Sequence, residues 1–362
     1  MNNMNNMNNI NAIKFISEGT SIISLSKIGE PPSISLEYSY NGVDWDRWDF
    51  SSLTINQMLY IRGYNSEGFS YSNDDYYSFI IEGDKVSCSG NIMSLIDYKN
   101  LPDVIPSYCC FYGLFKDCTS LTTAPELPAT TLAESCYESM FENCTSLVTA
   151  PALPATKLAD GCYRYMFYGC TSLTTAPELP AMKLAEYCYG SMFECCTSLT
   201  TAPALPATEL ADNCYEIMFS SCSSLTAAPE LPATELADSC YYRMFSDCAS
   251  LVKAPELPAT KLVNCCYGDM FSGCTTLTTA PELPAIELAP GCYSGMFECC
   301  FLLKTTPKLP AKKLANWCYS RTFAGCSSLK TAPELPKNVP YVNCYYNMFE
   351  GCTLLKGKVN SR

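Results

Sequence analysis

The most informative absence in this 362-residue sequence is histidine, of which there is none. Histidine is the usual general base near neutral pH, a common zinc ligand and the central residue of most nucleophilic triads. Its absence argues against most hydrolases and metalloenzymes. We therefore expect a protein that is not an enzyme, with no catalytic residues, no bound metal and no cofactor.

Basic residues are also scarce, because 23 Lys and Arg stand against 36 Asp and Glu, a formal net charge of −13. Such a chain repels nucleic acid and anionic membrane surfaces. The amino-terminal MNNMNNMNNINA lacks a basic region and an apolar stretch of signal-peptide length, and the sequence has no lipidation motif and no run of about 20 apolar residues. We expect neither nucleic-acid binding nor membrane insertion.

Cysteine, tyrosine and proline are abundant, with 25, 25 and 24 copies, and many of them recur with a constant step of 26 residues. Pro125 starts one such column, and Phe115 starts another. Two cysteine columns, which begin at Cys110 and Cys118, hold 20 of the 25 cysteines. The unit reads SLTTAPELPATxLAxxCYxxMFxxCT. A constant step without insertions predicts a solenoid, in which each unit buries its apolar side against the next.

Each unit is predicted to contain a short strand followed by a short helix. The strand is confined to residues 120–124 and their equivalents because Pro125 and Pro128 cannot donate to a ladder. Apolar residues at offsets 0, 1, 4, 5 and 8 from Cys136 suggest a helical stripe. The acidic column at Glu134 is typical of an N-cap, and the Asn143 column is typical of a left-handed helix end.

The repeated Phe, Cys and Leu positions form the predicted core ladder. Its members include Phe141, Phe167, Phe193, Phe219, Cys144, Cys170, Cys222, Leu147 and Leu173. The thiols are interpreted as small buried apolar groups, since no CxxC pair supports a zinc site. Occasional disulfide bonds between neighbours in the Cys144 column remain an alternative.

The region before the repeats has a different pattern, with alternating apolar and polar residues and a hairpin signal at Asn41-Gly42. It is predicted to be a small all-β, sandwich-like domain that caps the first repeat or serves for attachment. Trp45, Trp48 and tyrosines near Tyr71 suit either sugar stacking or core packing, and core packing is favoured. The predicted organisation is a disordered Asn/Met-rich leader at 1–11, the β domain at 12–95, the repeats at 96–356 and a tail at 357–362.

The segment CYxxMFxxCTSLTTAPELP resembles the BspA-like, or treponemal-type, leucine-rich repeats, whose units centre on an aromatic-x-x-Cys-x-x-Leu core. Here that core is Phe141, Cys144 and Leu147, and the resemblance covers about residues 96–356 in a long, 26-residue variant. It implies a cell-surface protein of bacteria or protists that adheres to host proteins, other cells or glycans, and it implies no catalytic residues. The sequence departs from this pattern in having no visible secretion signal, which a virion-borne receptor-binding protein would not need.

The predicted fold is therefore an α/β leucine-rich-repeat solenoid of about ten repeats, with short parallel strands and short helices, behind the β domain. Variable outward positions are the best pointer to a binding face, because stacking fixes the core columns. The candidates are Thr174, Thr200, Thr226, Thr278, Lys304 and Lys330.

The predicted function is non-enzymatic binding or adhesion, with a protein or glycan on a host or neighbouring cell as partner. The expected location is the cell surface, the extracellular space or a virion. The alternative is a structural or receptor-binding fibre or decoration component of a phage particle or cell envelope. The carboxyl-terminal lysines either orient a partner or protect an edge strand. These lysines are Lys304, Lys308, Lys312, Lys313, Lys330, Lys337, Lys356 and Lys358.

Overall fold

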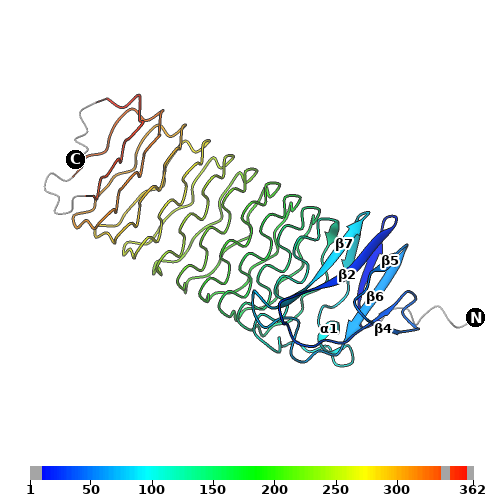
Figure 1. The fold of residues 1–362 in the computed structure, drawn as a ribbon. Helices are drawn as coiled ribbons and strands as arrows, with labels where there is room; N and C mark the ends of the chain where they lie inside the picture. The colour runs from blue at the N-terminus through cyan, green and yellow to red at the C-terminus, as the bar shows by residue number, and fades with distance from the viewer. Residues whose placement is uncertain (1–9, 336–342, 357–362) are drawn as a thin grey trace, which may run out of the picture.

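The structure is a computed structural model that describes residues 10–335 and 343–356. A β-rich amino-terminal part leads into a long stack of similar coils, and the last described coils lie at the end of the molecule opposite this part (Figure 1). The predicted leader, apart from residues 10 and 11, and the predicted tail at 357–362 lie outside the described residues, as do Lys337 and Lys358.

The amino-terminal part consists of two antiparallel sheets that pack against each other. Its strands are β1 (Ile13–Ser17), β2 (Ser21–Ile28), β3 (Leu36–Ser39), β4 (Asp46–Trp48), β5 (Leu53–Ile55), β6 (Met58–Gly63), β7 (Tyr76–Gly83) and β8 (Val86–Ser89). One sheet has the order β4-β3-β6-β1-β8-β9, where β9 (Leu121–Thr123) belongs to the first coil, and the other has the order β5-β2-β7. Phe15 of β1 and Phe79 of β7 meet between them, with ring centroids 5.7 Å apart. The predicted hairpin is present, because β3 and β4 pair on either side of Asn41-Gly42.

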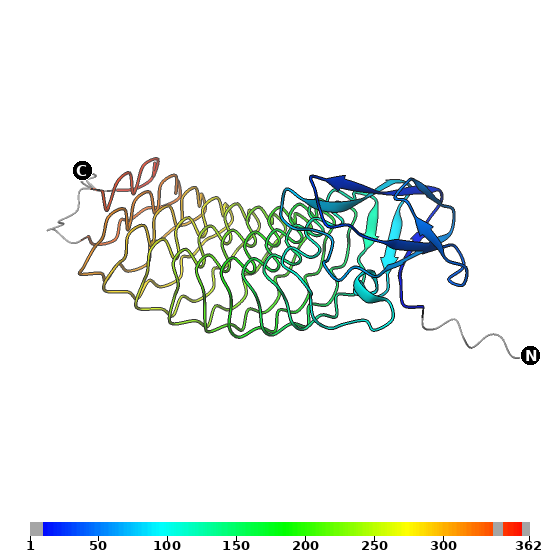
Figure 2. The ribbon, with the colours of Figure 1, turned by 60° about the horizontal axis from the view of Figure 1, so that its bottom comes forward.

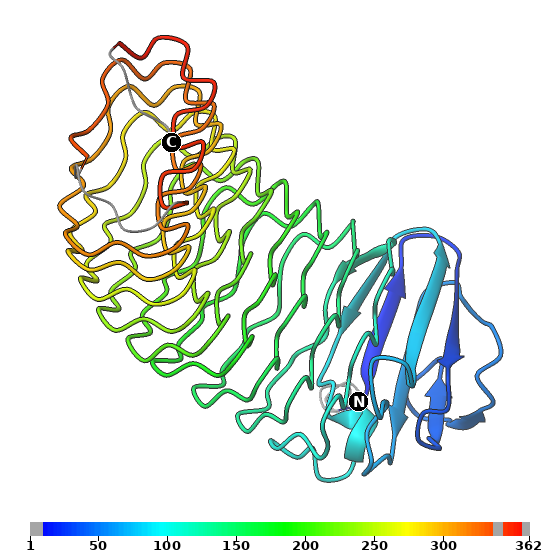
Figure 3. The ribbon, with the colours of Figure 1, turned by 60° about the vertical axis from the view of Figure 1, so that its left-hand side comes forward.

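The coils follow one another side by side along a curved path (Figures 2 and 3). Parallel β-bridges join equivalent residues of neighbouring coils, as between Thr149 and Thr175 and between Thr175 and Thr201. In the described coils only β9 is long enough to form a strand, whereas a strand had been expected in each repeat. The proline column beginning at Pro125 lies two residues after each bridge and supplies no N–H to extend it.

The predicted α/β solenoid with a helix in each repeat is wrong. Among the described residues the single α-helix is α1 (Ser94–Asp97), which precedes the coils. The segment predicted to be helical, residues 133–144 and their equivalents, is a succession of tight turns that we call the turn segment. Every backbone N–H from residue 135 to 144 donates a hydrogen bond within it or to the next coil.

Two alternating sets of hydrogen bonds explain why the turn segment is not a helix. Odd-numbered residues of this coil donate to a carbonyl 25 residues later, in the next coil, as Tyr137 does to Cys162 at 3.0 Å. Even-numbered residues donate to the carbonyl three residues earlier, as Met140 does to Tyr137 at 3.2 Å. Since half of the donors leave the coil, the bonds that would define a helix are never made.

Three left-handed residues in each turn segment set its period to four. Ser135, Ser139 and Asn143 have φ of 50°, 55° and 58°, and the same columns are left-handed in the other coils. The expected left-handed conformation of the Asn143 column is therefore present, but it ends no helix. A positive φ at the third residue of a turn redirects the chain. Apolar side chains then point inward in adjacent pairs every four residues, a spacing that resembles a 3.6-residue stripe over so short a segment.

The inward side chains form ladders that run the length of the stack. The phenylalanine ladder from Phe79 to Phe349 has successive centroids 5.1–5.8 Å apart. A second ladder begins at Phe69 and Phe111 and continues through the tyrosine column to Tyr345, with spacings of 5.7–6.0 Å. Fully buried Phe, Cys and Leu side chains include Phe141, Phe167, Phe193, Phe219, Cys144, Cys170, Cys222, Leu147 and Leu173.

The amino-terminal sheets supply the residues that a preceding coil would otherwise provide. Phe79 donates its N–H to Leu114 at 2.8 Å and stacks on Phe115, as each ladder phenylalanine does with the coil that follows. Phe69 likewise donates to Cys110 and stacks on Phe111. Strand β8 also pairs in parallel with β9, so the larger sheet continues into the bridges of the coil stack. The first coil therefore has a neighbour on both sides.

Candidate binding surface

The predicted binding residues share one column on the outside of the coil stack, which we call the threonine–lysine column. Its members are Thr122, Val148, Thr174, Thr200, Thr226, Val252, Thr278, Lys304, Lys330 and Lys356. Backbone bonds hold neighbouring members together, since the N–H of Val148 donates to Thr122 and that of Thr174 donates to Val148, both at 3.2 Å. All members are exposed except Thr122 and Thr278, which are half-buried.

The hydroxyls of Thr174 and Thr226 form only weak bonds to the protein, whereas that of Thr122 donates to the Val86 carbonyl at 3.2 Å. Thr174 Oγ1 lies 3.4 Å from the Val148 carbonyl oxygen, and Thr226 Oγ1 lies 3.5 Å from that of Thr200. These distances are at the long limit for hydroxyl donors. The hydroxyls therefore retain most of their capacity to donate to and accept from a ligand.

A second exposed column, nine residues further along each coil, carries charges that pair with each other. Lys183 and Glu209 lie 3.1 Å apart, and Lys313 and Glu287 lie 2.7 Å apart, all with well-exposed side chains. Each pair joins two adjacent coils. Exposed pairs of this kind contribute about 0–1 kcal/mol each, so their main effect is to neutralise this part of the surface.

The left-handed columns of the turn segment are the feature that sequence reasoning missed. The column of Ser139 contains Gly, Ser, Tyr, Ile, Arg, Asp and Asn, whereas the threonine–lysine column contains only Thr, Val and Lys. In one part of this surface the Arg164 guanidinium lies over the rings of Tyr165 and Tyr187, at 4.8 and 4.5 Å from their centroids. The diversity of this column was visible in the sequence, but the helix interpretation placed it in the middle of a predicted helix.

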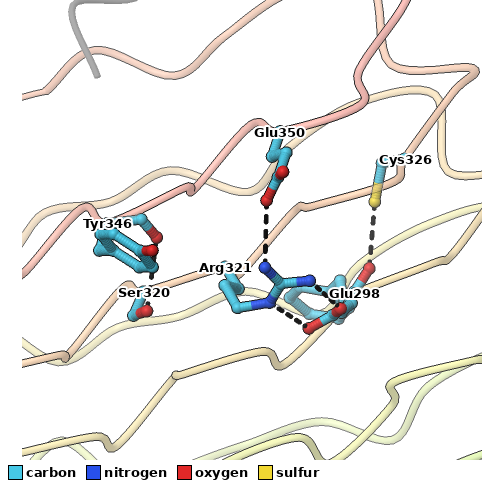
Figure 4. Close-up of polar contacts among 7 residues, drawn as sticks. Glu298, Ser320, Arg321, Cys326, Tyr346 and Glu350 are labelled. Atoms are coloured by element: carbon cyan, nitrogen blue, oxygen red, sulfur yellow. Dashed lines mark hydrogen bonds and ion pairs between the residues drawn. The ribbon is translucent and has the colours of Figure 1, made fainter. Parts of the chain in front are cut away.

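Arg321 is the centre of a charged cluster near the carboxyl-terminal end of the stack (Figure 4). Its Nε and Nη2 donate to the two carboxylate oxygens of Glu298, and its Nη1 donates to Glu350 Oε2 at 3.0 Å. Glu298 and Glu350 belong to the coils on either side of Arg321. This arrangement links three coils and leaves the guanidinium largely satisfied, so it acts structurally.

The acidic column that was predicted to cap helices instead links coils. Asp212 Oδ1 accepts the backbone N–H of Asp238 at 2.9 Å, and Asp238 Oδ1 accepts that of Asn264 at 3.0 Å. The carboxylate satisfies a donor of the following coil at the start of its turn segment, where the chain makes no helix. These acids are therefore part of the scaffold.

Of the 25 cysteines, 21 are buried and four are partly buried, and no disulfide bond joins any of them within the described residues. In the column of Cys144 each thiol from Cys118 to Cys352 donates to a carbonyl of the preceding coil or of β7, at 3.0–3.2 Å. Burial raises the pKa of the Cys110 and Cys248 thiols to about 12. Thiols with so high a pKa are poor nucleophiles at neutral pH.

The aromatic residues considered for sugar binding in the β domain divide between core and surface. Trp48 is buried against Phe50 and Phe79. One face of Trp45 is covered by the Arg62 guanidinium, 3.7 Å from the ring centroid. Tyr71 is exposed. The structure therefore does not bring these residues together into a single aromatic platform.

Within residues 10–335 and 343–356, no group of three His, Cys, Asp or Glu side chains is arranged to hold a metal ion. No helix in this part of the chain is long and apolar enough to cross a membrane. The chain matches no protein-family model, no curated protein and no solved structure. With 25 cysteines and a 26-residue period, the chain is a cysteine-rich repeat protein.

Proposed function

We propose that this chain is a non-enzymatic binding protein that contacts a protein or glycan through the threonine–lysine column. The observation that carries this proposal is a line of Thr, Val and Lys side chains, one per coil and exposed in eight of the ten coils, on backbone that is hydrogen-bonded from coil to coil at several of its members. Each contact is weak, but a ligand that spans several coils adds them with little further loss of entropy.

The proposed setting is a cell surface, the extracellular space or a virion. The likeness of Phe141, Cys144 and Leu147 to the core of BspA-like repeats supports an adhesive role. Repeated, nearly identical coils suit a partner that is itself repetitive, such as a glycan chain or a dense array of surface proteins. A surface of this kind needs no mobile loop or catalytic group.

The test is adhesion of the labelled full chain to intact cells and to a glycan array. Replacing Thr174, Thr200 and Thr226 by Ala removes three exposed hydroxyls of the column. We expect adhesion to fall by roughly tenfold, because several weak contacts are lost together. The matched control replaces Thr156, Thr208 and Thr234, which are exposed but lie in a different column. Adhesion of this control should remain close to that of the unmodified chain.

The alternative is a structural spacer in a fibre, decoration protein or envelope. It is favoured by the continuous ladders, which would hold the two ends of the molecule at a fixed separation. If both triple variants adhered as well as the unmodified chain, with unchanged thermal unfolding, the result would favour the spacer. It would also reject the threonine–lysine column as the contact surface.

A further inference from the structure

The threonine–lysine column changes its chemistry in the last three coils. Seven coils present Thr or Val, and the next three present Lys304, Lys330 and Lys356. All three lysines are exposed, and the N–H of Lys356 donates to the Lys330 carbonyl at 3.1 Å, so their backbones are in direct contact. Neighbouring parallel strands are about 4.8 Å apart, which places three like charges close together on one line.

This lysine row has no compensating charge of its own. No ion pair joins any of its three members to an acid within the described residues, whereas Lys183 and Lys313, in the column nine residues further along each coil, are paired with Glu209 and Glu287. Like charges that lie directly opposite each other destabilise paired strands. The Thr that occupies this column in other coils would avoid that cost. The row is thus unfavourable for the isolated coil stack and favourable for an anionic ligand.

From this we infer that the lysine row binds an acidic polysaccharide, one that carries sulfate or carboxylate groups. This inference rests on the proposed function and specifies its ligand. Lys308 and Lys312 are also exposed and lie in the same coil as Lys304. However, the two flanking coils carry exposed Glu282 and Glu334 in the column of Lys308, so the positive charge is concentrated on the row itself. The row therefore meets a chain of spaced anionic groups at three points, on a protein whose formal net charge is −13.

Two features favour a polysaccharide over other polyanions. The same column continues from Lys304 into the hydroxyl of Thr278 and, beyond Val252, into that of Thr226, and these hydroxyls suit those of a sugar chain. Duplex DNA carries one charge about every 1.7 Å, and so dense a charge is repelled strongly by the acidic remainder of this protein. A polysaccharide with one charge every sugar or two is repelled less and matches the spaced lysines better.

The experiment compares binding of the full chain to fluorescent dextran sulfate of low substitution, whose charges are spaced like those of the proposed ligand, and to uncharged dextran of the same length. One variant replaces Lys304, Lys330 and Lys356 by Thr, the residue that other coils have in this column. The matched control replaces Lys157, Lys183 and Lys261 by Thr, the residue at position 131 of their column, and changes the net charge by the same amount. We expect the unmodified chain to bind dextran sulfate and not dextran, with affinity that falls as salt is added.

The expected loss is at least about tenfold for the row variant and less than about twofold for the control. Equal losses in both variants would overturn the inference, since net charge alone would then explain binding. So would equal binding of dextran and dextran sulfate, or tighter binding of single-stranded DNA or poly-glutamate than of dextran sulfate. The proposed function is judged separately, because the Thr174, Thr200 and Thr226 variant is tested for adhesion to cells.

Discussion

The Cys170 thiol donates a hydrogen bond to the Phe141 carbonyl oxygen, 29 residues earlier in the chain, at 3.1 Å. The same oxygen accepts the N–H of Cys144 at 3.1 Å, so a thiol of one coil and an amide of another meet at one carbonyl. This relationship recurs along the stack. It gives the cysteine column a role beyond filling space, because a serine or alanine there would alter both the packing and this bond.

Replacing Cys222 by Ala should lower the free energy of unfolding by about 1–2 kcal/mol, measured by urea denaturation. The change removes a fully buried thiol that donates to the Phe193 carbonyl, and it leaves a small cavity. Cys195 is a matched control because it is only partly buried and lies in an outward column. Its replacement by Ala should cost less than about 0.5 kcal/mol. Equal costs would contradict the structural role of the buried thiol.

Stability should decrease steeply at alkaline pH. Burial raises the pKa of the Cys248 thiol to about 12 and that of Cys318 to about 11, whereas an unfolded cysteine has a pKa of about 8.5. The stability that comes from keeping these thiols neutral is fully present below about pH 8.5 and is lost as the pH rises through their folded-state values.

Urea unfolding at a series of pH values tests this expectation. The midpoint should start to fall above about pH 9, and the stack should unfold cooperatively by about pH 12. The sequence contains no histidine, so no histidine titration should affect the midpoint between about pH 6 and 8. A midpoint that stayed constant up to about pH 11 would show that the buried thiols ionise without cost.

Replacing Phe79 by Ala should destabilise the first coil by about 3–5 kcal/mol. This ring is buried and provides the surface on which Phe115 stacks. Ile80, the next residue of β7, is 44% exposed and serves as the control, with an expected loss below about 1 kcal/mol. Hydrogen exchange should show faster exchange at the amides of residues 110–118 in the Phe79 variant. Unchanged exchange there would mean that β7 does not support the first coil.

Gly273 and Asp247 should be energetically coupled, because they lie in the same left-handed column of adjacent coils. A Cβ on Gly273 would come within 2.2 Å of Asp247 Oδ1, and Gly273 has a φ of 74°. We expect Gly273→Ala to cost about 1–2 kcal/mol from strain and the close contact. In the double variant with Asp247→Ala, part of that cost should be recovered.

Gly351 separates the backbone strain from the close contact. It also has a φ of 74°, but the nearest atoms to an added Cβ lie at 3.5 Å, an ordinary contact. Gly351→Ala should therefore show the strain without the clash, and a thermal unfolding series would compare the variants. If Gly273→Ala lowered the free energy of unfolding equally with and without the Asp247 side chain, the expected contact between that side chain and a Cβ at position 273 would be contradicted.

The sequence predicted the periodicity and the columns but not the local conformation. The offsets of Cys136, Tyr137, Met140 and Phe141 fit a period of four as well as a period of 3.6 over so short a segment. Non-glycine residues with positive φ, such as Tyr165, Ile217 and Trp317, could not be foreseen, because bulky and β-branched side chains disfavour that region. Tyr165 and Ile217 donate their N–H groups to carbonyls of the next coil, and these bonds hold them in that conformation.

A signal for this conformation was nonetheless present in the glycines. They occur in three outward columns spaced four residues apart, which is the spacing of the left-handed positions. These glycines are Gly113, Gly161, Gly169, Gly273, Gly291, Gly295, Gly325 and Gly351. At the candidate surface, the column containing Thr174 was identified from its variability, but the more diverse columns around Arg164 and Arg321 were not considered. Whether the threonine–lysine column binds a partner stays a prediction.

The alternation of N–H directions from Ser135 to Cys144 limits how such a gene can change length. One residue inserted into this segment would exchange the two alternating sets of donors. The N–H groups that now bond to the next coil would then face their own turn. Whole 26-residue units escape that penalty, since a complete copy restores every donor to its acceptor. Unequal recombination between nearly identical copies is therefore the route by which this protein can become longer or shorter while each remaining coil keeps its shape.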